Sequence, residues 1–260
     1  MPEAPKAMPI YPGLIGKVAL VTGASSGIGA ETARYLAVNM VTVVVNGRNR
    51  EKLNRVARAI DAAGGNALAV AADCTKSDEI DGMRRTVEEQ FGGVDLLIAF
   101  AGGGTRTEPI EELPEDKWDT MVEVNLKSKF LTVKSFLPGM KKRGSGSIVL
   151  MSSSAGRAPS EATLPYSCAQ SGVTMLTKNL AQQLGKHGIR INAVAPAAIR
   201  NERIEKYTTQ EEQAELAASF PIPRIGSPYD VAAATLFLCS EASSWITGVT
   251  LDITGGKVMG

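Results

Sequence analysis

In the stretch Val18-Ala19-Leu20-Val21-Thr22-Gly23-Ala24-Ser25-Ser26-Gly27-Ile28-Gly29, an apolar strand-like run ends in a glycine-rich turn, and a helix-forming segment follows from Ala30. Glycines at positions 23, 27 and 29 let the backbone turn sharply and approach a ligand closely. At the start of the helix, free N–H groups and the positive end of the helix dipole suit a pyrophosphate. The spacing Gly-x3-Gly-x-Gly therefore indicates a nucleotide-phosphate turn, and tight packing of strand on helix is the alternative reading of the same glycines.

Short apolar runs alternate with helical patterns along almost the whole chain. The strand-like runs cover residues 17–22, 41–46, 66–71, 94–99, 146–151, 190–194 and 248–253. The helical patterns cover residues 27–38, 50–63, 77–91, 115–142 (as two helices), 165–187 and 228–240. The runs are apolar without interruption, as expected of strands that are covered on both faces. This alternation predicts an α/β fold with a parallel sheet and helices on both of its faces.

The length and composition fit one globular domain with a large core. The chain has 260 residues, of which 44% are hydrophobic and 21% are charged. Met1 to Gly13 is polar and rich in proline, without the apolar centre of a signal peptide, and we interpret residues 1–13 as a flexible leader before a single domain, 14–260. Residues 197–227 are the least regular part, and they are either a solvated surface excursion or a lid over the substrate.

Several classes of function are disfavoured by the charge and the residue types. The formal net charge is +1, from 28 basic and 27 acidic residues, which favours neither a nucleic acid nor an anionic membrane as partner. The apolar runs are too short to span a bilayer. Three scattered cysteines indicate a reducing cytoplasm and no metal site, and the single histidine, His187, leaves little scope for histidine-centred catalysis.

In such a sheet, ligands bind outside the carboxyl ends of the strands, so the residues after each strand are candidates for a site. The second run leads into Asn46-Gly47-Arg48-Asn49, with no carboxylate for the ribose of NAD. Arg48 is instead placed to meet a 2′-phosphate, which predicts NADP(H); its alternative role is to begin the charged face of the next helix. After the third run, Asp73 could accept from an adenine amine or cap the helix near Ser77.

The remaining strand ends carry small and hydroxyl residues. The fourth run leads to Ala101-Gly102-Gly103-Gly104, a second place where the backbone could approach a ligand closely. Ser152-Ser153-Ser154 follows the fifth run, and Tyr166 stands at the start of a long helical pattern.

These motifs together resemble the short-chain dehydrogenase/reductase family over nearly the whole chain. The resemblance places the glycine turn at the cofactor, Asp73 at the adenine, Asn125 (in Val124-Asn125-Leu126), Ser153 and Tyr166 in the active site, and Ile191 to Pro196 and Ile246-Thr247-Gly248 in later strand signatures. It implies a Rossmann-type, doubly wound, mostly parallel seven-stranded sheet and a homotetramer or dimer. The cofactor-binding residues that it implies here are Gly23, Ser25, Ser26, Gly27, Ile28, Gly29, Arg48, Asn49, Asp73, Cys74, Ala101, Gly102, Tyr166, Gln170, Pro196 and Ile199.

The chain departs from the family pattern beside the tyrosine. The family pair is Tyr-x-x-x-Lys, whereas Tyr166 is followed by Gln170 on the same face of the expected helix. The family lysine binds the nicotinamide ribose and lowers the tyrosine pKa, and an unperturbed tyrosine titrates near pH 10. Glutamine keeps the hydrogen bonding without the charge. Proton donation by Tyr166 should therefore survive better than proton abstraction.

Three functions remain open on the sequence. The first is an NADP(H)-dependent reductase of a small carbonyl or imine substrate, in which Tyr166 donates the proton, Ser153 steadies the oxyanion and Gln170 holds the ribose. In that function the resemblance implies that Asn125 keeps the helix backbone open for a water path. The second is non-redox chemistry on the same nucleotide site, such as dehydration, isomerisation or cyclisation. The third is a cofactor-binding scaffold with little turnover.

Overall fold

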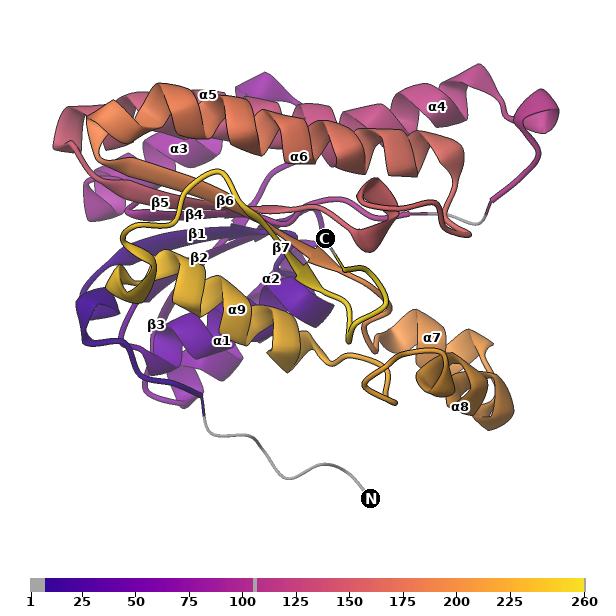
Figure 1. Ribbon diagram of the computed structural model, residues 1–260. Helices are drawn as coiled ribbons and strands as arrows, with labels where there is room; N and C mark the ends of the chain where they lie inside the picture. The colour runs from indigo at the N-terminus through magenta and orange to yellow at the C-terminus, as the bar shows by residue number, and fades with distance from the viewer. Residues whose placement is uncertain (1–7, 105–106, 260) are drawn as a thin grey trace.

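The protein is described by a computed structural model over residues 8–104 and 107–259. Within them one sheet of seven strands, all parallel, runs in the order β3-β2-β1-β4-β5-β6-β7 (Figure 1). The strands are β1 (Val18–Thr22), β2 (Thr42–Gly47), β3 (Asn66–Ala71), β4 (Leu96–Ala99), β5 (Gly146–Met151), β6 (Ile189–Pro196) and β7 (Thr250–Ile253). The predicted fold class is confirmed.

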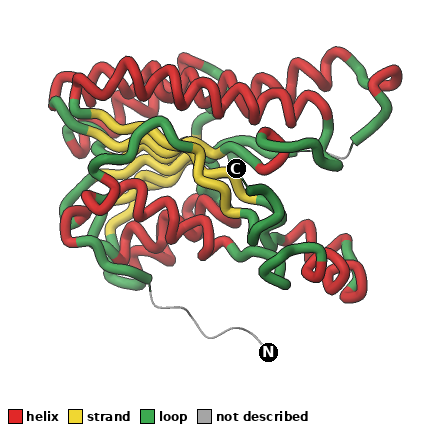
Figure 2. The backbone as a smooth tube through the Cα atoms, viewed as in Figure 1, coloured by secondary structure: helices red, strands yellow, loops and turns green. Residues whose placement is uncertain are grey.

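Helices cover both faces of this sheet, as Figures 1 and 2 show. One face carries α1, α2 and α9, and the other carries α3, α5 and α6. The helices are α1 (Gly27–Val38), α2 (Arg50–Ala62), α3 (Ser77–Phe91), α4 (Glu115–Val122), α5 (Ser128–Arg143), α6 (Leu164–Leu184), α7 (Glu202–Tyr207), α8 (Gln210–Ala218) and α9 (Pro228–Cys239). Because strands are covered on both sides, even the consecutive residues Val43, Val44 and Val45 are all fully buried.

The strand order reverses between β1 and β4. From β1 the chain builds outward through β2 to β3, and then returns to place β4 on the other side of β1. The loops that leave β1 and β4 consequently diverge to opposite faces of the sheet. This switch point is where open α/β sheets bind ligands.

The predicted helical stretch 115–142 forms one run with a changed pitch in its middle. Between α4 and α5, residues Glu123–Lys127 form a π-helical turn, in which the Ser128 N–H donates to the Glu123 carbonyl five residues earlier. The backbone on both sides of this turn keeps helical dihedral angles, so α4 and α5 are not separated by a loop. Such π turns are often found at functional sites.

The expected leader and lid differ from simple loops. The first seven residues of the leader lie outside the described residues. Its second half contacts the domain, because Asn39 at the end of α1 accepts from the Tyr11 N–H at 2.7 Å and donates to the Pro9 carbonyl at 3.2 Å. The excursion 197–227 contains α7 and α8, and a parallel bridge between Ile199 and Gly226 joins its two ends.

No helix in the described ranges is long and apolar enough to cross a membrane. Among the same residues, no group of three or more histidine, cysteine, aspartate or glutamate side chains could hold a metal ion.

Candidate active site

The glycine turn after β1 is tightly packed on its inner side. Gly23 has φ +69°, and a Cβ added there would lie 2.9 Å from the Phe100 carbonyl oxygen. A Cβ at Gly29 would collide with the Gly23 carbonyl, which explains why α1 can start so close to β1. Thr22 joins the turn to the end of β4, because its hydroxyl accepts from the Ala101 N–H at 3.1 Å.

The outer side of the same turn is open. Gly27, the first residue of α1, has φ +55°, and a Cβ there would meet no atom within 4 Å. Ser26 precedes the helix in an extended conformation and does not cap it with its side chain. The first N–H groups of a helix have no partner within the helix. The turn therefore offers donors and free space to an anionic group.

A cavity of about 360 Å³ lies next to this turn, at the switch point. It collects residues that lie far apart in the sequence, from the ends of β1, β4, β5 and β6 and from three helical segments. The predicted site residues among its lining are Gly23, Ser26, Ile28, Gly29, Ala101, Gly102, Asn125, Ser153, Tyr166, Gln170, Pro196 and Ile199. Four others, Arg48, Asn49, Asp73 and Cys74, lie at the ends of β2 and β3 and do not line this cavity, and neither do Ser25 and Gly27.

At the ends of β2 and β3, the predicted residues differ in what they contact. Arg48 is exposed, and its positive charge contributes to lowering the pKa of Asp73. Burial alone would raise that pKa, but hydrogen bonds from the Thr75 amide at 2.9 Å and hydroxyl at 2.8 Å outweigh it. Asn49 caps α2 by accepting from the Lys52 N–H. Cys74 is buried, and its thiol donates to the Asn46 Oδ1 at 3.1 Å, so its side chain serves the core.

Asn125 lies in the π turn and is fully buried. Its side chain donates to the Gly103 carbonyl at 3.0 Å and accepts from the Gly103 N–H at 2.9 Å. Both bonds hold the glycine loop that follows β4. Gly102 needs its missing side chain here, because an added Cβ would lie against Asn125 Oδ1.

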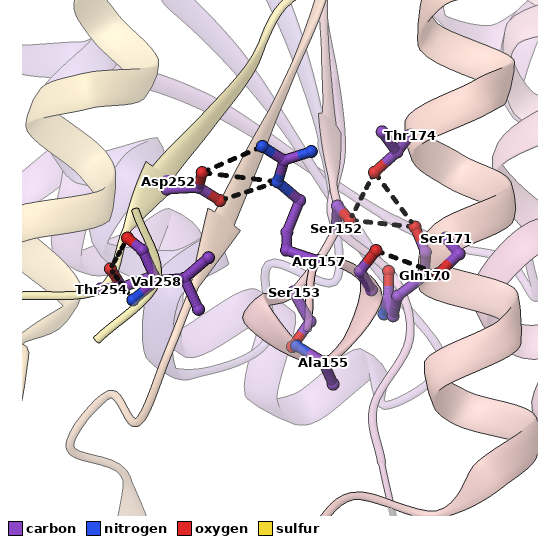
Figure 3. A network of polar contacts seen from close by, with 11 residues as sticks. Ser152, Ser153, Ala155, Arg157, Gln170, Ser171, Thr174, Asp252, Thr254 and Val258 are labelled. Atoms are coloured by element: carbon purple, nitrogen blue, oxygen red, sulfur yellow. Dashed lines mark hydrogen bonds and ion pairs between the residues drawn. The ribbon is translucent and has the colours of Figure 1, made fainter. Parts of the chain in front are cut away.

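Ser153 and Tyr166 meet at the cavity from β5 and α6. The Ser153 hydroxyl accepts from the Ala155 N–H at 3.2 Å (Figure 3), and Ser153 and Tyr166 line the same cavity. Burial raises the pKa of the Tyr166 phenol, and hydrogen bonds to Ser153 and Gln170 only partly oppose that effect. The phenol therefore keeps its proton at neutral pH.

Gln170 is buried four residues after Tyr166, with its side chain turned toward Asn125. Its Nε2 lies 3.5 Å from Asn125 Oδ1, while its Oε1 has no hydrogen-bond partner in the structure. An unsatisfied buried oxygen is costly, so this atom is suited to accept from a ligand hydroxyl. Ser152, directly after β5, is hydrogen-bonded to α6 at Gln170, because its hydroxyl donates to the Gln170 carbonyl at 3.0 Å (Figure 3).

The loop after Ser153 is tied to the last strand. Arg157 contacts the Asp252 carboxylate of β7 through its Nε at 3.1 Å and its Nη2 at 3.2 Å (Figure 3). Both side chains are mostly buried, so this ion pair is better protected from water than a surface pair. The ion pair joins the loop after Ser153 to β7 at the active-site end of the sheet.

Among the cavity residues that were not predicted as site residues, Lys129 is the charged one. Lys129, on α5, is 1% exposed, and its ammonium group donates to two backbone carbonyls that belong to the cavity wall. Its position four residues after Asn125 puts both on one helical face. The sequence does not show that this face is the buried one, so Lys129 looks like an ordinary surface lysine there.

The chain is similar over nearly its whole length to known oxidoreductases. Residues 17–212 match the family described as short chain dehydrogenase. The 7alpha-hydroxysteroid dehydrogenase of Escherichia coli (strain K12) is 35% identical over 245 residues, which cover 94% of this chain and 95% of that protein.

Two solved structures share the fold and hold a nucleotide. A 7α-hydroxysteroid dehydrogenase complexed with NADH and 7-oxo glycochenodeoxycholic acid has a TM-score of 0.89 at 34% identity, covering 95% of this chain and 96% of that one. A 3-oxoacyl-[acyl-carrier protein] reductase from Brucella melitensis with bound NAD also has a TM-score of 0.89, at 30% identity, covering 99% of this chain and 98% of that one.

This chain belongs to the short-chain dehydrogenase/reductase family. Its relatives are oxidoreductases, which supports an enzyme that transfers hydride.

Proposed function

We propose that the protein is an NADP(H)-dependent short-chain reductase that reduces a carbonyl or imine group of a small molecule. The observation that carries the proposal is the meeting of Asn125, Ser153, Tyr166 and Gln170 around one cavity beside the glycine turn. These four side chains come from the π turn, the end of β5 and the first turns of α6. A role in core packing alone would not require a hydroxyl, a phenol and two amides to converge on one cavity.

The residues present fit a dinucleotide. The open space over Gly27 and the exposed start of α1 suit its pyrophosphate. The partnerless Gln170 Oε1 suits a ribose hydroxyl. Solved relatives hold NAD or NADH, which supports a dinucleotide of this kind.

The end of β2 favours the phosphorylated form of the cofactor. Residues 46–49, at the end of β2 and after it, include no carboxylate to bind a ribose, and the Asn46 amide donates to the Val70 and Ala72 carbonyls, so it is committed to the sheet. Arg48 follows with an exposed guanidinium, which suits a 2′-phosphate. Its charge contributes to lowering the pKa of Asp73 at the end of the neighbouring strand β3, so the two residues lie near each other.

The chemistry divides between the nucleotide and the protein. When bound, the nucleotide supplies the hydride. The Ser153 hydroxyl donates to the substrate oxygen on which negative charge develops. Tyr166 holds its proton at neutral pH and gives it to that oxygen. Because burial keeps the phenol protonated, Tyr166 is in the form that proton donation to a carbonyl requires near pH 7.

The test is an absorbance assay of NADPH consumption with a panel of carbonyl and imine compounds. Tyr166→Phe should lower turnover about 100-fold or more, since general acid catalysis of this kind contributes that much. Tyr35→Phe, a matched change on α1, should leave turnover unchanged. If NADPH binds but no member of the panel consumes it, non-redox chemistry or a scaffold role is favoured instead. If no nucleotide binds, the proposal is wrong.

A further inference from the structure

Lys129 has an unusual environment for a lysine. Its side chain is fully buried beneath the active-site cavity, and its Nζ donates to the Asn125 carbonyl at 2.7 Å and to the Ala101 carbonyl at 2.9 Å. Both acceptors are neutral. Among the described residues, no carboxylate forms a salt bridge with it. A buried ammonium group without a counter-charge is costly, and such groups often mark functional sites.

The Asn125 carbonyl that accepts from this ammonium group lies within the π turn. Because the Ser128 N–H reaches back to Glu123 rather than to Val124, the hydrogen bonds of the helix are out of their normal register here. The Asn125 carbonyl thus accepts a hydrogen bond from the charged Lys129 side chain. The Asn125 side chain contacts Gln170 at 3.5 Å. Gln170 in turn lines the same cavity as Tyr166 and acts to lower the pKa of its phenol.

We propose that Lys129 is a positioning residue that supplies the active-site cavity with the positive charge missing at position 170. It reaches that position through Asn125, and it stabilises the negative charge left on Tyr166 after proton donation. This inference rests on the proposed function for its catalytic consequence, but the coupling between Lys129 and position 170 is independent of any substrate. The charge therefore comes to the site from α5 rather than from α6.

The groups around Lys129 determine how its charge varies with pH. Burial lowers the pKa of Lys129 to about 7, and Cys74, from the loop after β3, acts weakly in the opposite direction. Among the described residues, its ammonium group donates to the Ala101 carbonyl, in the loop after β4, and to the Asn125 carbonyl of the π turn. Tyr166 and Gln170 of α6 line the same cavity. Lys129 should consequently lose its charge as the pH rises through the neutral range.

The first experiment measures the coupling without substrate or cofactor. Isotope-labelled lysine is titrated by NMR in the full-length protein, and the Lys129 signal is identified by its loss in Lys129→Met. Gln170→Glu should raise the pKa of Lys129 by about one unit or more, and Gln170→Lys should lower it by a similar amount. Gln182→Glu, on the exposed side of α6, should leave it unchanged. Equal effects of the charge changes at positions 170 and 182 would overturn the inference.

The second experiment follows the pH profile of carbonyl reduction. In the wild-type protein the rate should fall as the pH rises through the neutral range, whereas Lys129→Met should be slower by about tenfold at acidic pH and lack this fall. Lys129→Gln, which keeps a hydrogen-bond donor but not the charge, should resemble Lys129→Met. Lys134→Met, an exposed lysine of the same helix, serves as the control.

The two experiments separate the inference from the proposed function. Rescue by Lys129→Gln would show that hydrogen bonding is sufficient, and it would overturn the role of the charge. If Lys129→Met does not fold, Lys129→Gln and the NMR titration of the position-170 variants still decide the question. If the NMR coupling is found but the protein reduces no carbonyl or imine, the proposed function fails while the coupling stands.

Discussion

The Gln170 Nε2 lies 3.5 Å from Asn125 Oδ1, and the carbonyl of the same asparagine accepts from the Lys129 ammonium at 2.7 Å. Asn125 therefore connects the neutral amide beside the phenol to a buried cation on the next helix. The sequence predicts a site without a cation, because position 170 lacks the family lysine. In the structure the cavity has a cation, and it enters from a different helix.

Gln170→Lys should restore the family pair and place an ammonium group next to Tyr166. It should lower the tyrosine pKa and raise the rate of alcohol oxidation about tenfold for each unit of that shift. The measurement is the pH profile of both directions with NADP(H). Ser171→Ala is the control on the same helix, and an unchanged profile in Gln170→Lys would contradict the electrostatic argument.

Arg48→Ala should weaken NADPH binding about 10-fold or more, since hydrogen bonds to charged groups contribute about 1.5–3 kcal/mol. NADH binding should change by less than about twofold, because NADH has no 2′-phosphate for Arg48 to contact. Fluorescence titration of both nucleotides measures the difference. Arg50→Ala, at the exposed start of α2, controls for the loss of one positive charge. Equal losses for NADPH and NADH would remove Arg48 from the 2′-phosphate site.

Lys129 should make the free energy of unfolding depend on pH. Burial lowers its folded-state pKa to about 7 from an ordinary value of 10.5, so between these pH values the unfolded chain binds more protons than the folded one. Stability should therefore rise with pH across this window, by about 1 kcal/mol per pH unit, and the full cost of the buried charge is present below pH 7. Urea unfolding of the wild-type protein and of Lys129→Met between pH 7 and 10.5 tests the predicted rise in unfolding free energy. Lys129→Met should lack this contribution, so the difference in unfolding free energy between the two proteins should change by about 1 kcal/mol per pH unit, and parallel curves would contradict the prediction.

Asp230→Asn should loosen the junction between the excursion 197–227 and α9. Asp230 accepts from Arg224 at 2.7 and 2.8 Å and forms a capping box with Ser227 at the start of α9. Burial would raise its pKa, but the Arg224 and Ser227 hydrogen bonds outweigh burial and lower it to about 2.

Because the folded pKa is below the unfolded one, this contribution is present above about pH 4 and is lost as the pH falls toward 2. At pH 7 Asp230→Asn should cost about 1 kcal/mol of unfolding free energy, a value reduced for the partial exposure of the pair. The difference between Asp230→Asn and wild type should shrink in acid. Glu211→Gln, on exposed α8, is the matched control.

Much of the candidate site could be predicted from the sequence, because its motifs lie within short stretches of the chain. Ser153 and Tyr166 each stand at the start or end of a predicted element, and Gln170 shares a helical face with Tyr166. The contacts of the Asn49 and Cys74 side chains could not be predicted in this way. Their side chains cap α2 and bond to Asn46 in the core, which depends on contacts that spacing does not reveal.

The sequence by itself determined the alternation of strands and helices, the glycine turn after β1 and the order of the site residues, because each depends on the residue types within a short window. Only the tertiary structure decided that Lys129 is buried and that its ammonium group meets carbonyls of the π turn and of the loop after β4. It also decided that Ile199 and Gly226 join the two ends of the excursion. The physical reason is that burial and charge at a position depend on which distant segments pack there, and those contacts form only when the sheet and its helices assemble.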